Sequence, residues 1–552
     1  MRRGARTRLT ARARGITELD SVSTRDFSLP LLCVLSLLAA CDGSLSGSGG
    51  GGAAGGDGGG AGEGGSAAGG SPPLPPVVCE HVGSGTDYEV GPGRPYESLG
   101  EVPTETLRGG DTIRLHHRPE PYREKIMLGG QGEEGQPIRL CGIPGPGGEL
   151  PVIDGSGAST RPESDFPYPG HQARGVVVIG HRNGDPYEEM PGPFVVEGIA
   201  VTGGRPTNTF VDVDGQTQSY SEAVGGIFVQ RGAGVTIRGC EVYDNANGLF
   251  LGTSGGEEGT YDALVEGNAV WGNGTPGSDR QHNVYDEVNR AIYQFNYFGP
   301  LHPESFGANV KERSAGLVFR YNFVEGGAHL LDLVDAQEAK AWHVDLPEYH
   351  ETFVYGNVLR STGMTGSMIH YGGDSEEYAL YRKGTLYFFH NTVFAEVAGQ
   401  EDYEVQALFE LSTNDERAWS RNNVYHASVP PTDYRPVVLL GGRDGLTSGV
   451  FVGAGDWSLR GLTPWKMIPD VMQNFEGDVQ GFDPASGNED PGFVDVPAGD
   501  FRPAVGSPLL EAGVPLEPDL EDTWLPVYSY VPHQSAEPRS DVSAPTIGAL
   551  LP

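Results

Sequence analysis

From about residue 84 onward, apolar residues alternate with polar ones in short runs, and no long amphipathic helical pattern appears. Gly, Asn, Asp and Pro separate the runs, and these residues favour turns over continued strands. Residues 226–229, 330–333 and 408–411 are typical runs. The pattern predicts a chain that is almost entirely β.

A repeated unit lies on top of this alternation: a strand-like run, then an Asn, one variable residue and an aliphatic or aromatic residue. The Asn positions that we assign to it are Asn268, Asn296, Asn322, Asn357, Asn391 and Asn422, and Cys240 takes the same place in an earlier copy. From Cys240 onward the copies are 28, 28, 26, 35, 34 and 31 residues apart, a range typical of stacked single-coil units.

An Asn at the same turn of every coil can hydrogen-bond to backbone groups and to its neighbours along the stack. A β-sandwich needs hairpin turns at shorter intervals and gives no reason for this repeated Asn. The repeat therefore predicts an all-β fold, a right-handed parallel β-helix with an internal Asn ladder.

The N-terminal region has a different composition. Residues 1–26 are rich in arginine, and the apolar run 27–40 is too short to span a bilayer comfortably, which predicts an export signal over residues 1–40. The run ends in Leu38-Ala39-Ala40-Cys41, which resembles the lipobox of bacterial lipoproteins and implies lipidation of Cys41. A chance cysteine after an ordinary signal peptide is the alternative.

Residues 43–70 contain 16 glycines among 28 positions, a composition typical of a flexible coil, and a proline-rich segment follows at 71–76. We therefore predict a tether over residues 41–78 and one β-helix domain over residues 79–552, including an N-terminal cap and C-terminal coils. The lipoprotein resemblance implies a lipid-anchored location in the envelope of a Gram-negative bacterium, at the outer membrane or cell surface.

The net charge limits the kinds of partner that the protein can bind. The formal net charge is −37, and removing residues 1–40, with seven basic and three acidic side chains, leaves −41, which excludes nucleic acid as a partner. We expect a monomer.

In an oxidising compartment Cys79 and Cys141 either form a disulfide or remain separate thiols. Cys240 lies in a core-like pattern and is expected to be a buried free thiol.

The densest run of unusual polar residues lies between residues 282 and 335. Adjacent coils stack about 4.8 Å apart, so outward residues at matching positions form a column within reach of one sugar chain. We expect Tyr285 or Asp286, then Lys311, then Asp332, to form such a column. Further candidates for contact with a substrate here are Asn309, His329 and His370.

Several segments carry a resemblance to known proteins. Residues 90–99, 110–115 and 151–155 and the tail 501–510 resemble the opening and closing coils of secreted β-helix proteins of the pectate-lyase-like superfamily that act on polysaccharides. Residues 309–322, which include Asn309-Val310-Lys311-Glu312-Arg313, resemble the catalytic coil of the alginate lyase and chondroitinase B family. This resemblance implies that Lys311 acts as the base. The chain departs from the family in the next coil, where His329-Leu330-Leu331-Asp332 replaces an Arg-His-Gly sequence.

The chemistry of β-elimination asks for these residue types. A base must remove the proton α to a uronic carboxylate, and cations or a metal ion must offset the negative charge that develops. We assign Arg313 and Arg320 as carboxylate or charge partners, and His282 or Tyr285 as the proton donor. Calcium held by carboxylate oxygens is a further expectation, although its ligands are unknown from the sequence.

Two other interpretations stay open. In the first, Lys311 and Arg313 form ion pairs with Asp286, Glu312 or Asp332 that tie coils together, and the protein is a non-catalytic carbohydrate-binding, adhesion or structural protein of the cell surface. In the second, the protein is a glycoside hydrolase in which Asp286 and Asp332 flank the substrate.

Overall fold

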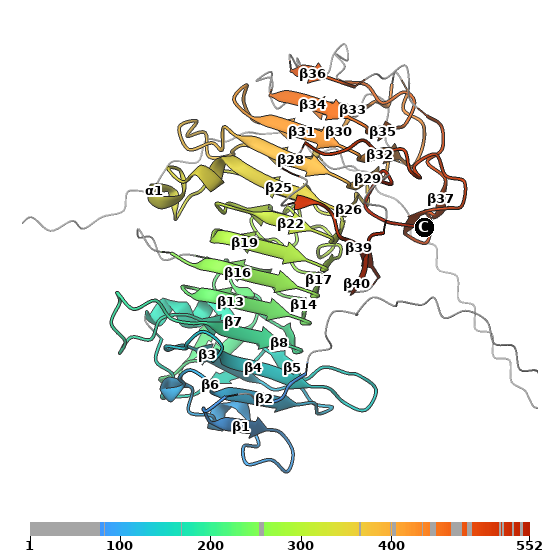
Figure 1. The fold of residues 1–552 in the computed structure, drawn as a ribbon. Coiled ribbons are helices and arrows are strands. Elements are labelled where there is room, and N and C mark those ends of the chain that lie inside the picture. Colours follow the sequence, from blue (N-terminus) through green and yellow to red (C-terminus); the bar gives the residue numbers. More distant parts are fainter. Residues whose placement is uncertain are drawn as a thin grey trace, which may run out of the picture. The chain divides into compact units, whose positions relative to one another are not determined.

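The computed structural model describes residues 78–552, except 82, 167, 253–258, 364–365, 398, 400–404, 433, 442–448, 465–476, 483–487, 518–519, 521–523, 533–534 and 541–544. The predicted signal peptide, the predicted lipidation site Cys41 and the tether up to residue 77 lie outside the described residues. The described chain winds into a right-handed parallel β-helix (Figure 1), as the repeat predicts. Among these residues, no helix has the length and apolar character needed to cross a membrane.

The described residues form three long sheets, one along each side of the coil. The first is parallel throughout, in the order β1 (Asp87–Val90), β2 (Thr112–His116), β4 (Ile138–Ile143), β8 (Phe194–Glu197), β13 (Ala233–Arg238), β16 (Tyr261–Glu266), β19 (Asn289–Gln294), β22 (Val318–Arg320), β25 (Glu351–Tyr355), β28 (Thr385–Phe389), β31 (Arg417–Arg421), β34 (Val450–Ala454) and β36 (Asp478–Gln480).

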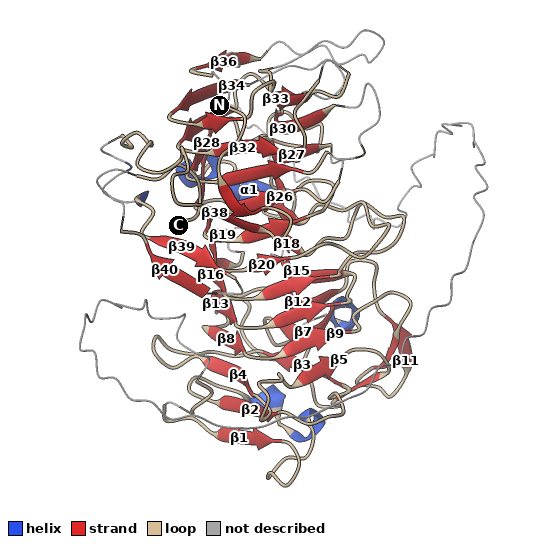
Figure 2. Ribbon diagram, turned by 90° about the vertical axis from the view of Figure 1, so that its right-hand side faces the viewer, coloured by secondary structure: helices blue, strands red, loops and turns tan. Residues whose placement is uncertain are grey.

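The second sheet, whose strands are stacked in Figure 2, is parallel except for its first pair. Its order is β11 (Thr217–Ser219), β10 (Thr209–Val211), β6 (Ala158–Thr160), β3 (Glu124–Leu128), β7 (Gly175–Ile179), β12 (Gly225–Val229), β15 (Asn247–Leu251), β18 (Val284–Asp286), β21 (Val310–Glu312), β24 (Leu331–Leu333), β27 (Ser367–Tyr371), β30 (Gln406–Leu411) and β33 (Val437–Gly441).

The third sheet has shorter strands, in the order β5 (Val152–Asp154), β9 (Ala200–Thr202), β14 (Glu241–Tyr243), β17 (Ala269–Trp271), β20 (Tyr297–Phe298), β23 (Phe323–Glu325), β26 (Val358–Arg360), β29 (Thr392–Ala395), β32 (Val424–Ala427) and β35 (Trp457–Ser458). Two antiparallel hairpins, β37 (Phe493–Asp495) with β38 (Asp500–Pro503) and β39 (Tyr528–Val531) with β40 (Ser535–Pro538), lie near the C-terminus. Among the described residues, the short helix α1 (Lys340–His343) and the 3-10 turns Leu99–Glu101, Thr104–Thr106, Pro169–Arg174 and Pro347–His350 belong to the loops.

The core consists of inward side chains that stack from coil to coil. In the first sheet one register line carries Val196, Ile237, Val265, Tyr293, Phe319, Val354 and Phe388, all fully buried. Each such aliphatic or aromatic side chain contributes roughly 1.5–3 kcal/mol when it leaves water. The period-2 alternation of the sequence is therefore the signature of one face packed inside the coil.

The predicted Asn ladder is present from Asn268 to Asn391. The backbone N–H and Nδ2 of Asn268 both donate to Oδ1 of Asn296, each at 3.0 Å, and the same pair of bonds recurs on the coils that follow. It continues through Asn322, Asn357 and Asn391. These bonds satisfy buried polar groups at a sharp turn inside the core.

Asn422 was wrongly assigned to the ladder. The backbone N–H and Nδ2 of Asn391 donate to Oδ1 of Asn423, at 2.8 and 3.1 Å. Asn422 instead takes the turn position that precedes each ladder residue, where the backbone is left-handed: φ is 59° at Phe295, 54° at Tyr321, 51° at His390 and 56° at Asn422. Glycine fills that position before Asn268 and Asn357, and asparagine tolerates it better than most residues. Two consecutive asparagines therefore have different functions in the turn.

The ladder ends in an aspartate, Asp456, whose ionisation should make the stability of the protein depend on pH. Oδ1 of Asp456 accepts hydrogen bonds from the backbone N–H and Nδ2 of Asn423, at 2.8 and 3.0 Å. Burial raises the pKa of Asp456 from 3.8 to about 6, so the folded state holds a proton there that the unfolded chain releases. The free energy of unfolding then falls as the pH rises from about 4 to about 6.

We expect Asp456→Asn to remove this contribution and to raise the thermal midpoint at pH 8 by about 1–3 °C, with little change at pH 4. Thermal unfolding of both proteins at the two pH values measures it. Asp478→Asn, an exposed change on β36, is the matched control. An equal shift at both pH values would show that charge on Asp456 is irrelevant.

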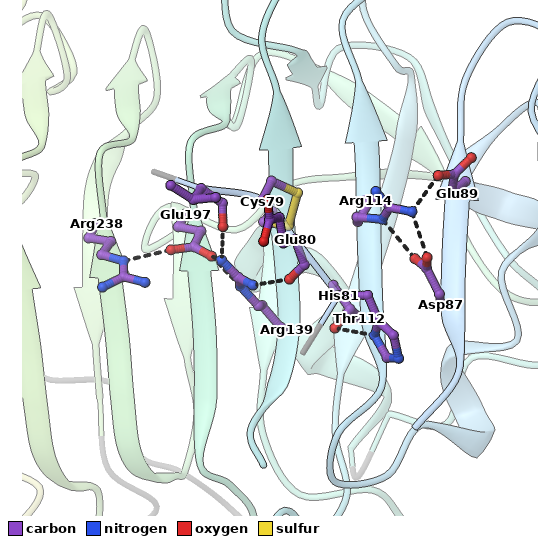
Figure 3. The surroundings of a disulfide bond; sticks show 12 residues. Cys79, Glu80, His81, Asp87, Glu89, Thr112, Arg114, Arg139, Glu197 and Arg238 are labelled. Carbon is purple, nitrogen blue, oxygen red and sulfur yellow. Dashed lines mark hydrogen bonds and ion pairs between the residues drawn. A yellow bond between two sulfur atoms is a disulfide. The ribbon is translucent and has the colours of Figure 1, made fainter. Parts of the chain in front are cut away.

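The N-terminal coils are joined by a disulfide between Cys79 and Cys141, one of the two expected outcomes (Figure 3). The segment that carries Cys79 lies across the first sheet, where Arg139 donates to the carbonyls of Glu80 and Val78, at 2.6 and 2.8 Å. Arg139 also pairs with Glu197. Cys240 is a buried free thiol, as expected, and burial raises its pKa to about 12.

The C-terminal segment covers the outer aromatic side chains of the first sheet. Phe295, Tyr321, Tyr355 and Phe389 belong to one apolar cluster with Leu516, and Trp524 stacks on Phe353 with ring centroids 4.2 Å apart. The hairpin β39–β40 lies beside these strands in Figure 1, and the Val527 N–H donates to the Tyr321 hydroxyl at 3.0 Å. This part of the first sheet is therefore packed against the chain itself.

Candidate functional site

A concave pocket of about 700 Å³ opens on the outer face of the second sheet. This volume lies within the range that holds a small ligand or a few sugar units. We call it the site pocket, and the residues that line it are Asp279, Arg280, His282, Tyr285, Phe306, Ala308, Lys311, Arg313, Ala328, His329, Asp332, Gln337, His370 and Asp374.

Strand register builds one wall of the site pocket. The parallel pairing of β18, β21, β24 and β27 aligns Tyr285, Lys311, Asp332 and His370 in one outward column. The expected column is confirmed, with Tyr285 and not Asp286 as its first member. On the N-terminal side the same column is apolar, and Phe250 stacks on Tyr285 with ring centroids 4.6 Å apart. The column thus changes from aromatic to ionisable residues where the pocket begins.

Lys311 and Arg313 share one carboxylate, that of Asp374. The Lys311 ammonium donates to both Asp332 and Asp374, and only 11% of its side chain is exposed. Arg313 donates to Asp374 Oδ1 at 3.0 Å and to the Asp335 carbonyl. Burial alone would raise the pKa of Asp374, but the two cations more than offset it and hold that pKa below its ordinary value. Of the expected ion pairs, Lys311–Asp332 is present, whereas Arg313 pairs with Asp374 and Asp335 and with none of the expected partners.

His370 and Asp332 form a second buried pair. Nδ1 of His370 lies 2.8 Å from Asp332 Oδ1, and its Nε2 lies 2.9 Å from the Ser412 hydroxyl. Burial lowers the pKa of His370, but the Asp332 carboxylate and nearby Glu410 outweigh it, so that pKa lies above its ordinary value. Burial likewise opposes the charge on Asp332, but Lys311 holds its pKa well below the usual range.

The other two histidines of the site pocket are neutral near pH 7. Burial lowers the pKa of His282 to about 3 and also lowers that of His329. Nδ1 of His329 lies 2.7 Å from the Ser367 carbonyl, and Nδ1 of His282 lies 3.2 Å from the Ala308 carbonyl. A carbonyl only accepts, so we assign the proton of each ring to Nδ1, which leaves a lone pair on Nε2.

Tyr285 keeps its proton. Its hydroxyl donates to Glu338 Oε2 at 3.2 Å, and burial raises its pKa well above the ordinary value. Glu338 belongs to the loop that follows β24, and Glu287 holds this loop by accepting from the backbone N–H groups of residues 337–339. The loop is thereby fixed beside the pocket.

Arg320 lies outside the site pocket, contrary to its assignment as a carboxylate partner. It belongs to β22 of the first sheet, where it donates to Gln294 Oε1 and the Tyr355 hydroxyl, each at 2.9 Å. The chain turns a corner of the coil between Arg313 and Arg320, so closeness in sequence did not bring the two arginines to one face.

Asp286 and Asn309 point into the core and do not contact the pocket. Oδ2 of Asp286 accepts from the Tyr293 hydroxyl at 2.5 Å, and burial together with Glu312 raises the pKa of Asp286 well above its ordinary value. Asn309 belongs to a second internal ladder, in which Asn283 Nδ2 donates to its Oδ1 at 3.0 Å. The hydrolase interpretation that paired Asp286 with Asp332 is wrong, because the two carboxylates face opposite sides of the sheet.

A fully buried ion pair, Arg382 with Glu312, connects the turns next to the site pocket. Arg382 donates to Glu312 Oε2 and to the Ser314 carbonyl, each at 2.9 Å, and to the Val334 carbonyl at 3.0 Å. Both side chains of the pair have no exposed surface. Arg382 thus joins the turns that follow β21 and β24, which carry Arg313 and Asp335.

Comparison with known proteins gives only distant likeness. No family model matches the chain, and no curated protein matches it. Among solved structures, the pectate lyase Pel9A is 12% identical, with 85% of this chain and 97% of that chain covered and a TM-score of 0.44. The alginate lyase from Paenibacillus sp. str. FPU-7 is 13% identical, covering 68% and 95%, with a TM-score of 0.32. The GH136 lacto-N-biosidase from Eubacterium ramulus is 12% identical, covering 72% and 68%, with a TM-score of 0.33.

The sheet topology itself establishes the architecture. The domain is a parallel β-helix. At these identities and scores the likeness to other structures says nothing about the activity of this one, which depends on the side chains of its own site pocket.

Proposed function

We propose that the protein acts on an acidic polysaccharide and cleaves it by β-elimination in the site pocket. The observation that carries this proposal is the placement of Lys311 and Arg313 in a concave, polar pocket of a chain with net charge −37. Arg280, Lys311 and Arg313 balance the three aspartates that line this pocket, so the pocket carries less negative charge than the chain as a whole. Phe306, 61% exposed at the pocket, offers an aromatic surface for a sugar ring.

The pocket groups match the needs of the reaction. In this proposal Arg313 and Arg280 bind the uronate carboxylate, and Lys311 takes the proton from the adjacent carbon. The C–H electron pair then forms the new C=C bond while the glycosidic C–O bond breaks. Tyr285, which keeps its proton, donates it to the leaving oxygen.

The carboxylates of Asp332 and Asp374, which accept hydrogen bonds from Lys311, are in position to receive its proton. An ammonium offers no lone pair, so Lys311 must first pass its own proton to a neighbour. Asp374 is the more exposed of its partners, with 22% of its side chain accessible against 6% for Asp332, and therefore has the shorter path to solvent. The same contacts favour the non-catalytic interpretation, a glycan-binding pocket without turnover.

An absorbance assay separates these two functions. The full-length protein is incubated with alginate, pectate and glycosaminoglycans, and the ultraviolet absorbance of the unsaturated uronate is followed. We expect a steady rise with at least one of them. Retention of labelled polysaccharide without any rise in absorbance would replace the enzyme by a binding protein, and neither retention nor a rise would overturn both functions.

We also propose that the protein is lipid-anchored in the cell envelope through Cys41. The disulfide between Cys79 and Cys141 supports export, because such bonds persist in oxidising compartments. We expect labelled palmitate to enter the full-length protein in a Gram-negative host and to be absent from Cys41→Ser, which then leaves the membrane fraction. Cys33→Ser is the matched control. Equal label in both variants would refute the anchor.

A further inference from the structure

Three side chains on one wall of the site pocket converge. One ring nitrogen of His329, one carboxylate oxygen of Asp332 and one ring nitrogen of His370 lie within 4.8 Å of one another. All three residues line the pocket. We propose that they form a binding site for a divalent transition-metal ion, with Zn²⁺ as the best match.

The other polar atoms of these side chains are already engaged. His329 Nδ1 is held by the Ser367 carbonyl, His370 Nε2 by the Ser412 hydroxyl, and one oxygen of Asp332 by Lys311. Metal-binding histidines usually use their second ring nitrogen in this way, since the outer bond fixes the orientation of the ring. Nε2 of His329, Nδ1 of His370 and Oδ1 of Asp332 are then the atoms available to an ion.

Ser412 indicates which nitrogen of His370 carries the proton. Its Oγ accepts from the Gly373 N–H at 2.9 Å, and its own hydroxyl proton has an acceptor in the Gly373 carbonyl at 3.1 Å. The hydroxyl is therefore placed to accept from His370 Nε2–H. A ring whose single proton is on Nε2 presents the lone pair of Nδ1 to Asp332 Oδ1 at 2.8 Å, and two acceptors at that distance require a positive charge beside them. A proton supplies this positive charge to Nδ1 of His370 and Oδ1 of Asp332 only. A metal ion binds both of these atoms and Nε2 of His329 as well.

The donor set selects the class of ion. Two imidazoles and one carboxylate suit Zn²⁺, Co²⁺ or Ni²⁺, whereas Ca²⁺, which the sequence led us to expect, takes six to eight oxygen ligands. Charge agrees with a divalent ion, because four carboxylates surround the site against two cations: Asp332, Asp335, Asp374 and Glu410 against Lys311 and Arg313. Three protein ligands beside an open pocket leave a position for water or a substrate oxygen.

Binding can be measured without a polysaccharide, so the inference stands apart from the proposed activity. The full-length protein is treated with a chelator, exchanged into metal-free buffer and titrated with Zn²⁺ by calorimetry and with Co²⁺ by visible absorption. We expect one equivalent of each to bind. His329→Ala and His370→Ala should each weaken binding at least tenfold, while His302→Ala, in a neighbouring pocket, leaves it unchanged.

His329→Cys gives a readout that a purely structural histidine cannot. A thiolate bound to Co²⁺ produces a charge-transfer absorption, and its appearance requires direct ligation at residue 329. Circular dichroism of each variant checks that it is folded. Absence of stoichiometric binding in the parent, or parent-like affinity in both His→Ala variants, overturns the metal site. A protein that binds Zn²⁺ and yields no unsaturated product overturns the proposed activity and leaves the metal site standing.

Discussion

Lys311→Ala is expected to lower the rate of β-elimination by about 10²–10⁴-fold, the usual contribution of a positioned proton-transfer group. Lys311→Arg is expected to fall as far, because a guanidinium keeps the positive charge but does not accept a proton near neutral pH. The rise of ultraviolet absorbance with an active polysaccharide measures both variants. Comparison of the two variants shows whether Lys311 acts through its lone pair, as a base, or through its positive charge.

Lys340→Ala is the matched control, since Lys340 is exposed on α1, with 47% of its side chain accessible, and does not line the site pocket. Activity of Lys311→Arg within tenfold of the parent would assign Lys311 to charge stabilisation and remove it as the base. Activity of Lys311→Ala equal to that of Lys340→Ala would remove Lys311 from the reaction altogether.

Arg382→Met is expected to give the largest loss of stability, about 3–5 kcal/mol, because it leaves the Glu312 carboxylate buried without its cation. It also leaves the carbonyls of Ser314 and Val334 without their donor. Urea unfolding followed by circular dichroism measures the loss. Arg417→Met, at an exposed position of β31, is the control for a change of Arg to Met.

The double variant Glu312→Leu with Arg382→Met tests the cause of this loss. When both charges are removed, no unpaired carboxylate remains, so the double variant should be more stable than Arg382→Met alone. If the two losses simply add, the ion pair does not explain the effect, and the contacts of Arg382 with the backbone do.

Much of the fold could be predicted from the sequence because every coil of a β-helix has the same structural requirements. Each coil needs a turn inside the core, and the Asn ladder from Asn268 to Asn391 marks it. The assignment of Asn422 failed because the left-handed position and the ladder position are adjacent, and both accept asparagine. Only the hydrogen bonds distinguish Asn422 from Asn423.

The site was predicted less well, for geometric reasons. The outward column of Tyr285, Lys311 and Asp332 follows from coil stacking, but a shift of one residue across the pleat turns Asp286 into the core. Asp374 belongs to a loop with no repeat, so no pattern in the sequence pointed to it as the shared partner of Lys311 and Arg313. The roles of the pocket residues in catalysis or binding stay predictions.

The disulfide of Cys79 also decides where a mechanical load enters the domain. A pull on the chain before Cys79 passes through the sulfur bridge to Cys141 in β4, the third strand of the first sheet. Strands β1 and β2 lie within the covalent loop between the two cysteines and carry little of this tension. The outermost coils are therefore protected from being peeled away one hydrogen bond at a time, and the load enters at β4 and passes to the next coil through the pairing of β4 with β8.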